Sequence, residues 1–229
     1  MSTVVDLRVW GVDRVAPAVL RMATGRRHLT RSPGLRFAKL LGTGAGRTFT
    51  PSDADPHHWA LLTVWDDEAA ADAGPDPRLT DPWDDAAAER LTVRMTPLSS
   101  RGRWAGVEPF AASTGTDQDR HDGPVAVITR ARLRPTRAVS FWRAVPPVVD
   151  DLAQAPGLRL ALGVGEAPVL LQGTFSVWES RQHLVDFAYR TAAHREAVAR
   201  TEPARWYAEE LFARFAVREV SGTYRGRLP

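Results

Sequence analysis

Eight stretches of the chain have the apolar pattern of β-strands, and three longer stretches have the spacing of helices. The predicted strands cover residues 4–10, 35–41, 59–65, 91–98, 125–133, 158–163, 169–177 and 211–217. The predicted helices cover residues 16–28, 136–153 and 180–201. A further helix begins at Asp66, is interrupted by a glycine and three prolines, and is expected to resume over residues 83–89. Residues 47–58 and 99–123 are expected to form loops.

The same order of elements occurs twice, which indicates an internal repeat. The sequence SPGLR at residues 32–36 reappears as APGLR at residues 155–159, and LLTVW at residues 61–65 is matched by TFSVW at residues 174–178. Each half reads β-α-β-β-α-β, which is the ferredoxin-like pattern. We therefore predict an N-terminal unit over residues 1–111, a connector over 112–123, and a C-terminal unit over 124–229 that carries the functional site.

The strands of the second unit indicate how the two units combine. In residues 125–131 and 211–217 both alternating faces are largely apolar, whereas a sheet covered on one side only should alternate apolar with polar residues. Helices cover one face, and the sheet of the other unit is expected to cover the second. The predicted fold class is α+β, with two tandem ferredoxin-like units that form a dimeric α+β barrel-type fold within one chain.

The amino-acid composition excludes several kinds of functional site and partner. The 229 residues include no cysteine, which excludes disulfides, thiolate nucleophiles, iron–sulfur clusters and thiolate-ligated haem. No apolar run reaches the length of a transmembrane helix and no signal peptide is recognisable, so a cytoplasmic protein is expected. The formal net charge is +3, the basic residues are scattered among acidic ones, and no nucleic-acid motif is present, so no nucleic-acid partner is expected.

His194, in the predicted helix over residues 180–201, is the preferred candidate for a metal ligand. On a continuous helix it shares a face with His183 and Phe187, which points mostly toward the sheet. A neutral imidazole there can bind a metal through one nitrogen and donate a hydrogen bond from the other. The alternative is a histidine of the core or its boundary whose hydrogen bonds are satisfied within the protein.

Three polar residues on otherwise apolar strands are candidates for a binding pocket: Arg130, Gln172 and Arg214. Such groups need partners when they are buried, and a ligand could supply them. The alternative is that they pair with one another or with loop carbonyls. His57 and His58 stand in a loop rich in proline and aspartate, and that loop is expected to be solvated.

The chain resembles the spheroidene monooxygenase family, the haem-dependent carotenoid ketolases of purple bacteria. The resemblance rests on segments that span almost the whole chain in order: LLGTGAGRTFTP (40–51), HWALLTVW (58–65), GRWAGVEPF (102–110), ITRARL (128–133), GVGEAPVLLQGTFSVW (163–178), AHREAVARTEPARWYAEELFARF (193–215) and the tail SGTYRGRLP (221–229). The chain departs from the family at Tyr224, where tryptophan is more usual, and in the 47–58 loop.

The resemblance implies a monooxygenase with haem b that uses dioxygen and a ferredoxin-type electron donor to oxidise a hydrophobic small molecule, either a carotenoid or a natural-product precursor. It implies that His194 is the proximal ligand, with the three polar strand residues at the distal side or the haem propionates. Four aromatic residues are expected to form the apolar walls: Phe141, Trp142, Phe187 and Trp206.

Other functions stay open at this point. They are a haem enzyme of the same fold with aldoxime dehydratase-like or peroxidase-like chemistry, a cofactor-free monooxygenase, and a non-catalytic barrel that binds a hydrophobic ligand. A homo-oligomer is compatible with all of them.

Overall fold

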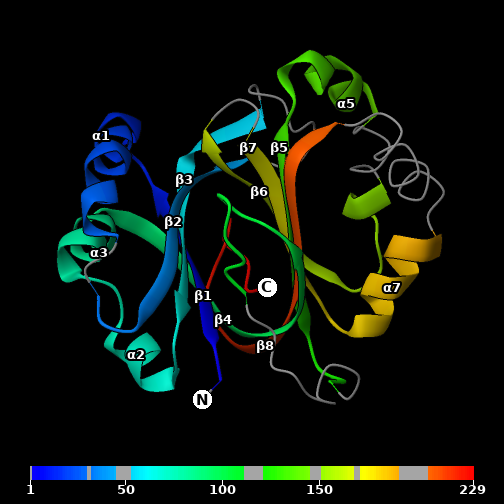
Figure 1. The fold of residues 1–229 in the computed structure, drawn as a ribbon. Helices are drawn as coiled ribbons and strands as arrows, with labels where there is room; N and C mark the ends of the chain where they lie inside the picture. Colours follow the sequence, from blue (N-terminus) through cyan, green and yellow to red (C-terminus); the bar gives the residue numbers. More distant parts are fainter. Residues whose placement is uncertain are drawn as a thin grey trace.

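The computed structural model describes residues 2–29, 32–44, 53–110, 121–144, 151–167, 171–190 and 206–229. Its strands close into one antiparallel barrel in the order β1-β3-β2-β6-β7-β5-β8-β4 (Figure 1). The strands are β1 (Val4–Val12), β2 (Leu35–Gly44), β3 (Ala54–Trp65), β4 (Ala87–Gly102), β5 (Val125–Leu133), β6 (Leu158–Ala167), β7 (Leu171–Trp178) and β8 (Tyr207–Gly222). The helices are α1 (Val15–Gly25), η1 (Arg26–His28), α2 (Glu68–Ala73), α3 (Pro77–Asp84), η3 (Pro135–Arg137), α5 (Ala138–Ala144) and α7 (Arg181–Arg190).

The barrel consists of two sheets with the same strand order. The first sheet runs β4-β1-β3-β2 and the second runs β8-β5-β7-β6, each with the order of a ferredoxin-like unit. The sheets join where β2 pairs with β6 and where β4 pairs with β8. The predicted fold class is therefore confirmed. The boundaries of the predicted units stay a prediction, because most of the 112–123 connector lies outside the described residues.

Alternate residues of every strand point into the barrel and fill it. Val5, Leu62, Val93, Ile128 and Phe175 are among the side chains of this single buried cluster. The barrel interior is thus a packed core of apolar side chains.

The outer face of the first sheet is covered by α1, α2 and α3, at the left of Figure 1. The indole of Trp83 on α3 stacks on Trp10 of β1 at 5.5 Å and lies 6.0 Å from Trp59 of β3. Local sequence sets up these short helices: the Asp67 carboxylate accepts the Ala70 N–H at the start of α2, and the Asp76 carboxylate accepts the Arg78 N–H at the start of α3.

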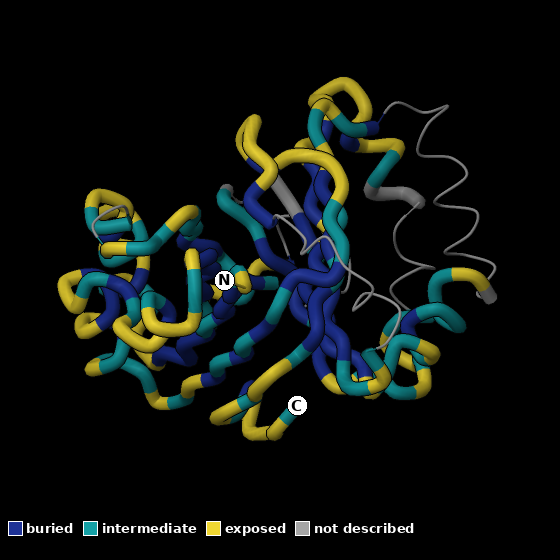
Figure 2. Tube along the Cα trace, turned by 60° about the horizontal axis from the view of Figure 1, so that its bottom comes forward, coloured by how far each residue is buried: buried dark blue, intermediate teal, exposed yellow. Residues whose placement is uncertain are grey.

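The outer face of the second sheet carries α5 and α7. Phe187 of α7 packs on Trp178 of β7 at 5.3 Å, and Leu184 joins the same buried cluster. Figure 2 shows the buried residues along the barrel strands and the exposed ones mainly on the helices and turns outside them. Within the part of the chain that the structure describes, no helix has the length and apolarity needed to cross a bilayer.

Three local predictions are wrong because long-range pairing extends the strands. The helix expected over residues 83–89 ends at Asp84, and β4 begins at Ala87, which pairs with Val12. Residues 54–58 belong to β3 rather than to a loop, and residues 99–102 continue β4. The alanines at 86–88 favour a helix locally, but the ladder to β1 overrides that preference.

Candidate functional site on the second sheet

The outer face of the second sheet is open at its centre. β5 lies between β7 and β8, and Thr129 in the middle of β5 pairs with Thr174 on one side and Phe212 on the other. Thr129 is exposed, while Thr174 and Phe212 are half-buried. A residue in the middle of a central strand is normally covered, so this row of three residues marks a place that the described helices leave accessible, between the buried Val127 and Ala131.

The next row along the sheet contains the candidate Arg214. Val127 of β5 pairs with Ser176 of β7 and with Arg214 of β8, and the Ser176 hydroxyl accepts the indole N–H of Trp178 at 3.0 Å. Arg214 is half-buried on this outer face. Gln172 lies two positions before Thr174 on β7 and pairs with Ala131; its side chain is outside the described part.

The first sheet has an equivalent row with a different centre. Asp6 of β1 pairs with Thr63 of β3 and with Arg94 of β4. The Arg94 guanidinium donates to both carboxylate oxygens of Asp6, at 3.0 and 3.3 Å, and the Thr63 hydroxyl accepts the indole N–H of Trp65 at 3.0 Å. Burial raises the pKa of Asp6, and Arg94 opposes that shift. The repeat therefore preserves the arginine and the hydroxyl but replaces Asp6 by Val127.

Arg130 lies on the opposite side of the sheet from Arg214, at the mouth of the barrel. Its guanidinium forms ion pairs with Glu166 at 3.1 Å and with Glu209, and it lies 5.5 Å from the centre of the Trp104 ring. Burial opposes ionisation of Glu166, but the bonds from Lys39 and Trp104 hold the pKa of that carboxyl below its ordinary value. The structure thus separates Arg130 from the other two polar candidates.

The predicted wall residues lie on both sides of the open row. Phe187 packs near the Val125 end of β5, over Trp178. Phe141 and Trp206 pack together at 5.7 Å near the other end, where the Trp206 indole donates to Ser140 at 2.9 Å. His194 lies outside the described residues, and Trp142 belongs to α5 but its side chain is not described.

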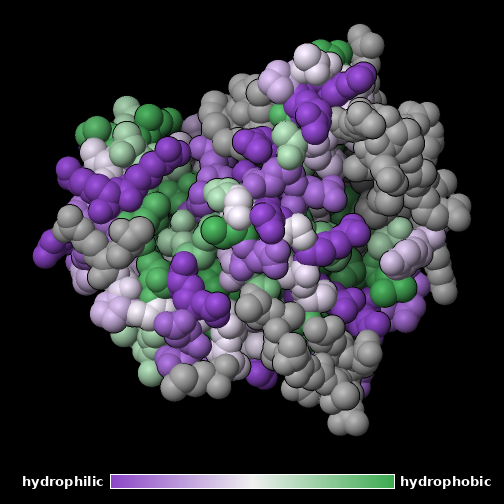
Figure 3. All heavy atoms as spheres, viewed as in Figure 1, coloured by the Kyte–Doolittle hydropathy of each residue, from purple (hydrophilic) through white to green (hydrophobic). Residues whose placement is uncertain are grey.

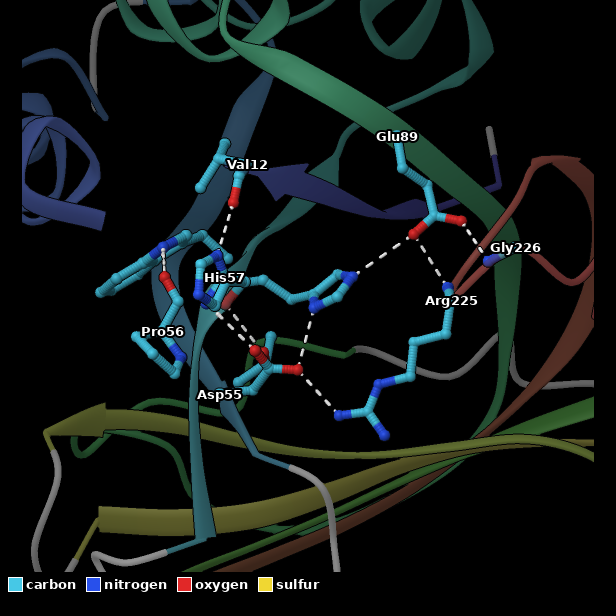
Figure 4. Close-up of polar contacts among 10 residues, drawn as sticks. Val12, Asp55, Pro56, His57, Glu89, Arg225 and Gly226 are labelled. Carbon is cyan, nitrogen blue, oxygen red and sulfur yellow. Dashed lines mark hydrogen bonds and ion pairs between the residues drawn. The ribbon is translucent and has the colours of Figure 1, made fainter. Parts of the chain in front are cut away.

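A second polar cluster, which sequence reasoning missed, closes one end of the barrel (Figure 4). The His58 ring lies between two carboxylates, with Nδ1 2.9 Å from Asp55 and Nε2 3.3 Å from Glu89. The bond with Asp55 raises the pKa of His58 and lowers that of Asp55. Tyr224 packs edge-on against His58 at 4.9 Å, and burial raises the pKa of Tyr224 to about 12. The expectation of a solvated loop is wrong for His58, whose side chain is only 14% exposed and lies in β3, whereas His57 is exposed as expected.

Two matching turns hold the ends of the barrel. Glu89 accepts the backbone N–H groups of Arg225 and Gly226 at 2.8 and 2.6 Å. Glu209 accepts those of Ala105 and Gly106 at 3.1 and 2.8 Å. Ala105 and Arg225 have positive φ angles of 54° and 53°, so the turns share one backbone shape. The similarity of GRWAG at residues 102–106 to GTYRG at residues 222–226 was the available signal in the sequence.

Neither cluster has the composition of a metal centre. Among the described residues, no group of three or more His, Asp or Glu side chains could hold a metal ion. Both clusters are ion-pair networks that fasten the turns to the barrel ends. The open row on the second sheet is therefore the better candidate for a ligand site.

Comparison with known proteins agrees with this fold and gives the family. No protein-family profile matches the chain. Two structures of aldoxime dehydratase share the fold, with TM-scores of 0.62 and 0.61 at 12% identity, and they cover 95% of this chain and 82% and 80% of theirs.

The curated relatives are closer in sequence. Spheroidene monooxygenase of Rhodobacter capsulatus is 33% identical over 220 residues, covering 96% of this chain and 90% of the relative. Spheroidene monooxygenase of Rubrivivax gelatinosus is 38% identical over 224 residues, covering 96% of this chain and 80% of the relative. This degree of identity over nearly the whole length confirms the resemblance found in the sequence, and the chain belongs to the spheroidene monooxygenase family of oxidoreductases.

Proposed function

We propose that this chain is a haem-dependent monooxygenase that oxidises a hydrophobic small molecule, with haem b bound over the outer face of the second sheet. The observation that carries the proposal is the exposed Thr129 in the middle of β5, because the equivalent face of the first sheet is closed by helices and tryptophans. Family membership supports the oxygenase chemistry. The substrate is a carotenoid or a natural-product precursor of similar hydrophobicity.

The residues around the open row fit a haem in chemical type. A porphyrin has a large apolar surface, and the half-buried Phe212 beside Thr129 offers an apolar contact to it. Its propionates carry negative charge, for which an arginine is a well-matched partner. A propionate beside Arg214 would take the role that the Asp6 carboxylate has beside Arg94 in the first sheet.

His194 would hold the iron, as the family resemblance implies. Bound haem supplies the activation of dioxygen and the oxidation of the unactivated carbon, with electrons from a ferredoxin-type donor. The chain's own groups bind and orient the cofactor and the reacting ligand. Arg214 holds the anionic edge of the cofactor, and Gln172 is the proposed hydrogen-bond donor toward the reacting ligand. Removing such a donor typically lowers the rate about 100- to 1000-fold.

The aromatic residues on either side of the row exclude water. Phe187 on Trp178 forms one wall, and Phe141 on Trp206 forms the other. Arg130 has a structural role in this proposal, because its ion pairs with Glu166 and Glu209 lie on the inner side of the barrel.

Optical spectroscopy of protein expressed with a haem supply tests the proposal. We expect a Soret band that is lost or shifted in His194→Ala and unchanged in His28→Ala, a matched histidine substitution in the first half. A colourless, iron-free protein that retains oxygenase activity would overturn the haem. An unchanged spectrum in His194→Ala would retain haem and reject His194. A haem-loaded protein that dehydrates aldoximes and consumes no dioxygen would reject the oxygenase chemistry.

A further inference from the structure

One segment of the chain contains basic residues but no acidic ones. Residues 14–52 contain seven arginines and one lysine but no aspartate or glutamate, although the whole chain has a net charge of only +3. The basic residues are therefore not scattered evenly among acidic ones, as the sequence first indicated. It includes α1 and the residues that immediately precede and follow it.

The solvent-facing side of α1 is apolar. Ala16, Val19, Leu20 and Ala23 are all exposed, and Val19 and Leu20 keep 52% and 65% of their surface accessible. The opposite side of the helix packs through Ala18 and other residues against the tryptophans of the first sheet. An exposed helix normally presents charged residues to solvent, so α1 has the character of a helix with a second apolar contact to make.

Arginines lie at both ends of this apolar face. Arg14 precedes the helix, and Arg26 and Arg27 follow it; all three are exposed. Their hydrogen bonds within the described structure go to the Glu166 carbonyl from Arg26 and to His28 from Arg27. None of these three arginines has a carboxylate within ion-pair distance among the residues described. Figure 3 shows hydrophobic residues over α1 at the upper left, beside hydrophilic ones.

We propose that α1 docks on an anionic lipid surface. A helix with an apolar face and flanking arginines lies in the interface of a bilayer, where the apolar side chains enter the acyl boundary and the cations meet lipid phosphates. A second copy of the chain fits less well, because pairing two such faces brings their arginines together. Nucleic acid offers phosphates but no contact for Leu20 and Val19. α3, which packs beside α1, exposes both Arg78 and Asp81, so the excess of basic residues belongs to the segments that flank α1.

Vesicle flotation tests this inference with the full chain. Vesicles of phosphatidylcholine with phosphatidylglycerol are compared with vesicles of phosphatidylcholine alone. We expect binding to the anionic vesicles that weakens as salt is added. Leu20→Glu should lower the partition coefficient about tenfold or more, because it removes a large apolar side chain from the interface. The double variant Arg14→Glu and Arg27→Glu should lower it by about fivefold for each arginine, or more.

Matched control variants distinguish the contribution of the apolar face of α1 from the general effect of losing an exposed leucine or of changing the net charge. Leu228→Glu alters a leucine that is 70% exposed elsewhere, and Arg132→Glu with Arg227→Glu gives the same change of net charge away from α1. Both controls should bind anionic vesicles nearly as the parent does. Equal binding to the two kinds of vesicle, or Leu20→Glu binding like the parent, would overturn the proposal. A concentration-dependent dimer that Leu20→Glu abolishes would assign the face to a second copy instead. None of these measurements depends on haem.

Discussion

The two sheets of the barrel share one framework and differ in what covers their outer faces. On the first sheet, Asp6 and Arg94 form a buried ion pair and Trp83 covers the face with Trp10 and Trp59. On the second sheet, Val127 stands where Asp6 would be, and Thr129 is open to solvent. The first half thus stabilises the fold, while the second half keeps an accessible surface that a ligand can cover.

The largest difference between the halves should come from their two equivalent arginines. Arg94→Leu should lower the free energy of unfolding by about 3–5 kcal/mol, because it leaves the buried Asp6 carboxylate without its partner. Arg214→Leu has Val127 rather than an aspartate as its neighbour on β5, and should cost distinctly less. Urea unfolding of both variants checks this, and equal costs would contradict the contrast between the sheets.

The aromatic side chains that cover the two sheets should also stabilise the fold to different degrees, with the larger contribution on the first sheet. Trp83→Ala removes a side chain that is 1% exposed, stacked on Trp10 and packed against Trp59, and should cost about 3–5 kcal/mol. Phe187→Ala removes a half-buried ring and should cost about 1–3 kcal/mol. Thermal unfolding without added cofactor measures both. If Phe187→Ala were the more costly change, the second sheet would be as firmly closed as the first.

Val127→Asp tests whether the lost carboxylate matters for the cofactor. The substitution recreates the pattern of the first sheet, so the new carboxylate competes with a propionate for Arg214 and repels it. We expect haem affinity to fall about tenfold or more, measured by titration of the Soret band. Val127→Asn is the matched uncharged control and should bind haem more tightly than the aspartate variant. Equal haem affinities of the aspartate and asparagine variants would show that Arg214 does not bind the propionates.

The two ends of the barrel should respond differently to pH. The pKa of His58 is raised above 6.5 by Asp55, so the stability that this pair contributes is fully present below about pH 6.5 and is lost as the pH rises through the raised pKa. The pKa of Asp55 is lowered from 3.8, so its contribution is present above about pH 4 and is lost on acidification. His58→Asn should remove the decline at higher pH in urea unfolding. Substituting Arg130, which pairs with Glu166 and Glu209 at the other end of the barrel, should leave that decline in place.

The smallest effects should be equal in the two halves. Thr63→Ala and Ser176→Ala each remove the acceptor of a buried indole N–H bond of 3.0 Å, and each should cost about 1 kcal/mol. Similar costs in denaturant unfolding would show that this part of the repeat is energetically the same in both sheets. A cost in only one sheet would show that the repeat has diverged in its framework as well.

The fold could be predicted from the sequence because local patterns of apolar and polar residues reveal its repeat. The apolar strands and the repeated PGLR segments give the two units, and the apolar faces of residues 125–131 give their association. Strand ends could not be predicted, since residues 54–58 and 87–89 are fixed by partners far away in the chain.

The site was only partly predictable. Arg130 and Arg214 are both polar residues in apolar strands, and alternation places each on a face of its own strand. Which face points into the barrel follows from the pairing of strands, and this separates the two arginines. The cluster at His58 depends on Glu89 and on the turn at residues 222–227, which are distant in the sequence; only the turn itself had a signal, in its similarity to residues 102–106.

The closed barrel also bears on how its two sheets could come to differ. Either half alone would leave two strand edges unpaired, and the other half covers both. If two identical chains closed such a barrel, every substitution would appear on both sides, and a change from aspartate to valine would open both faces and remove both ion pairs. Covalent duplication breaks that constraint. One copy can keep the buried ion pair that stabilises the fold. The other copy can lose that ion pair and become able to bind a ligand.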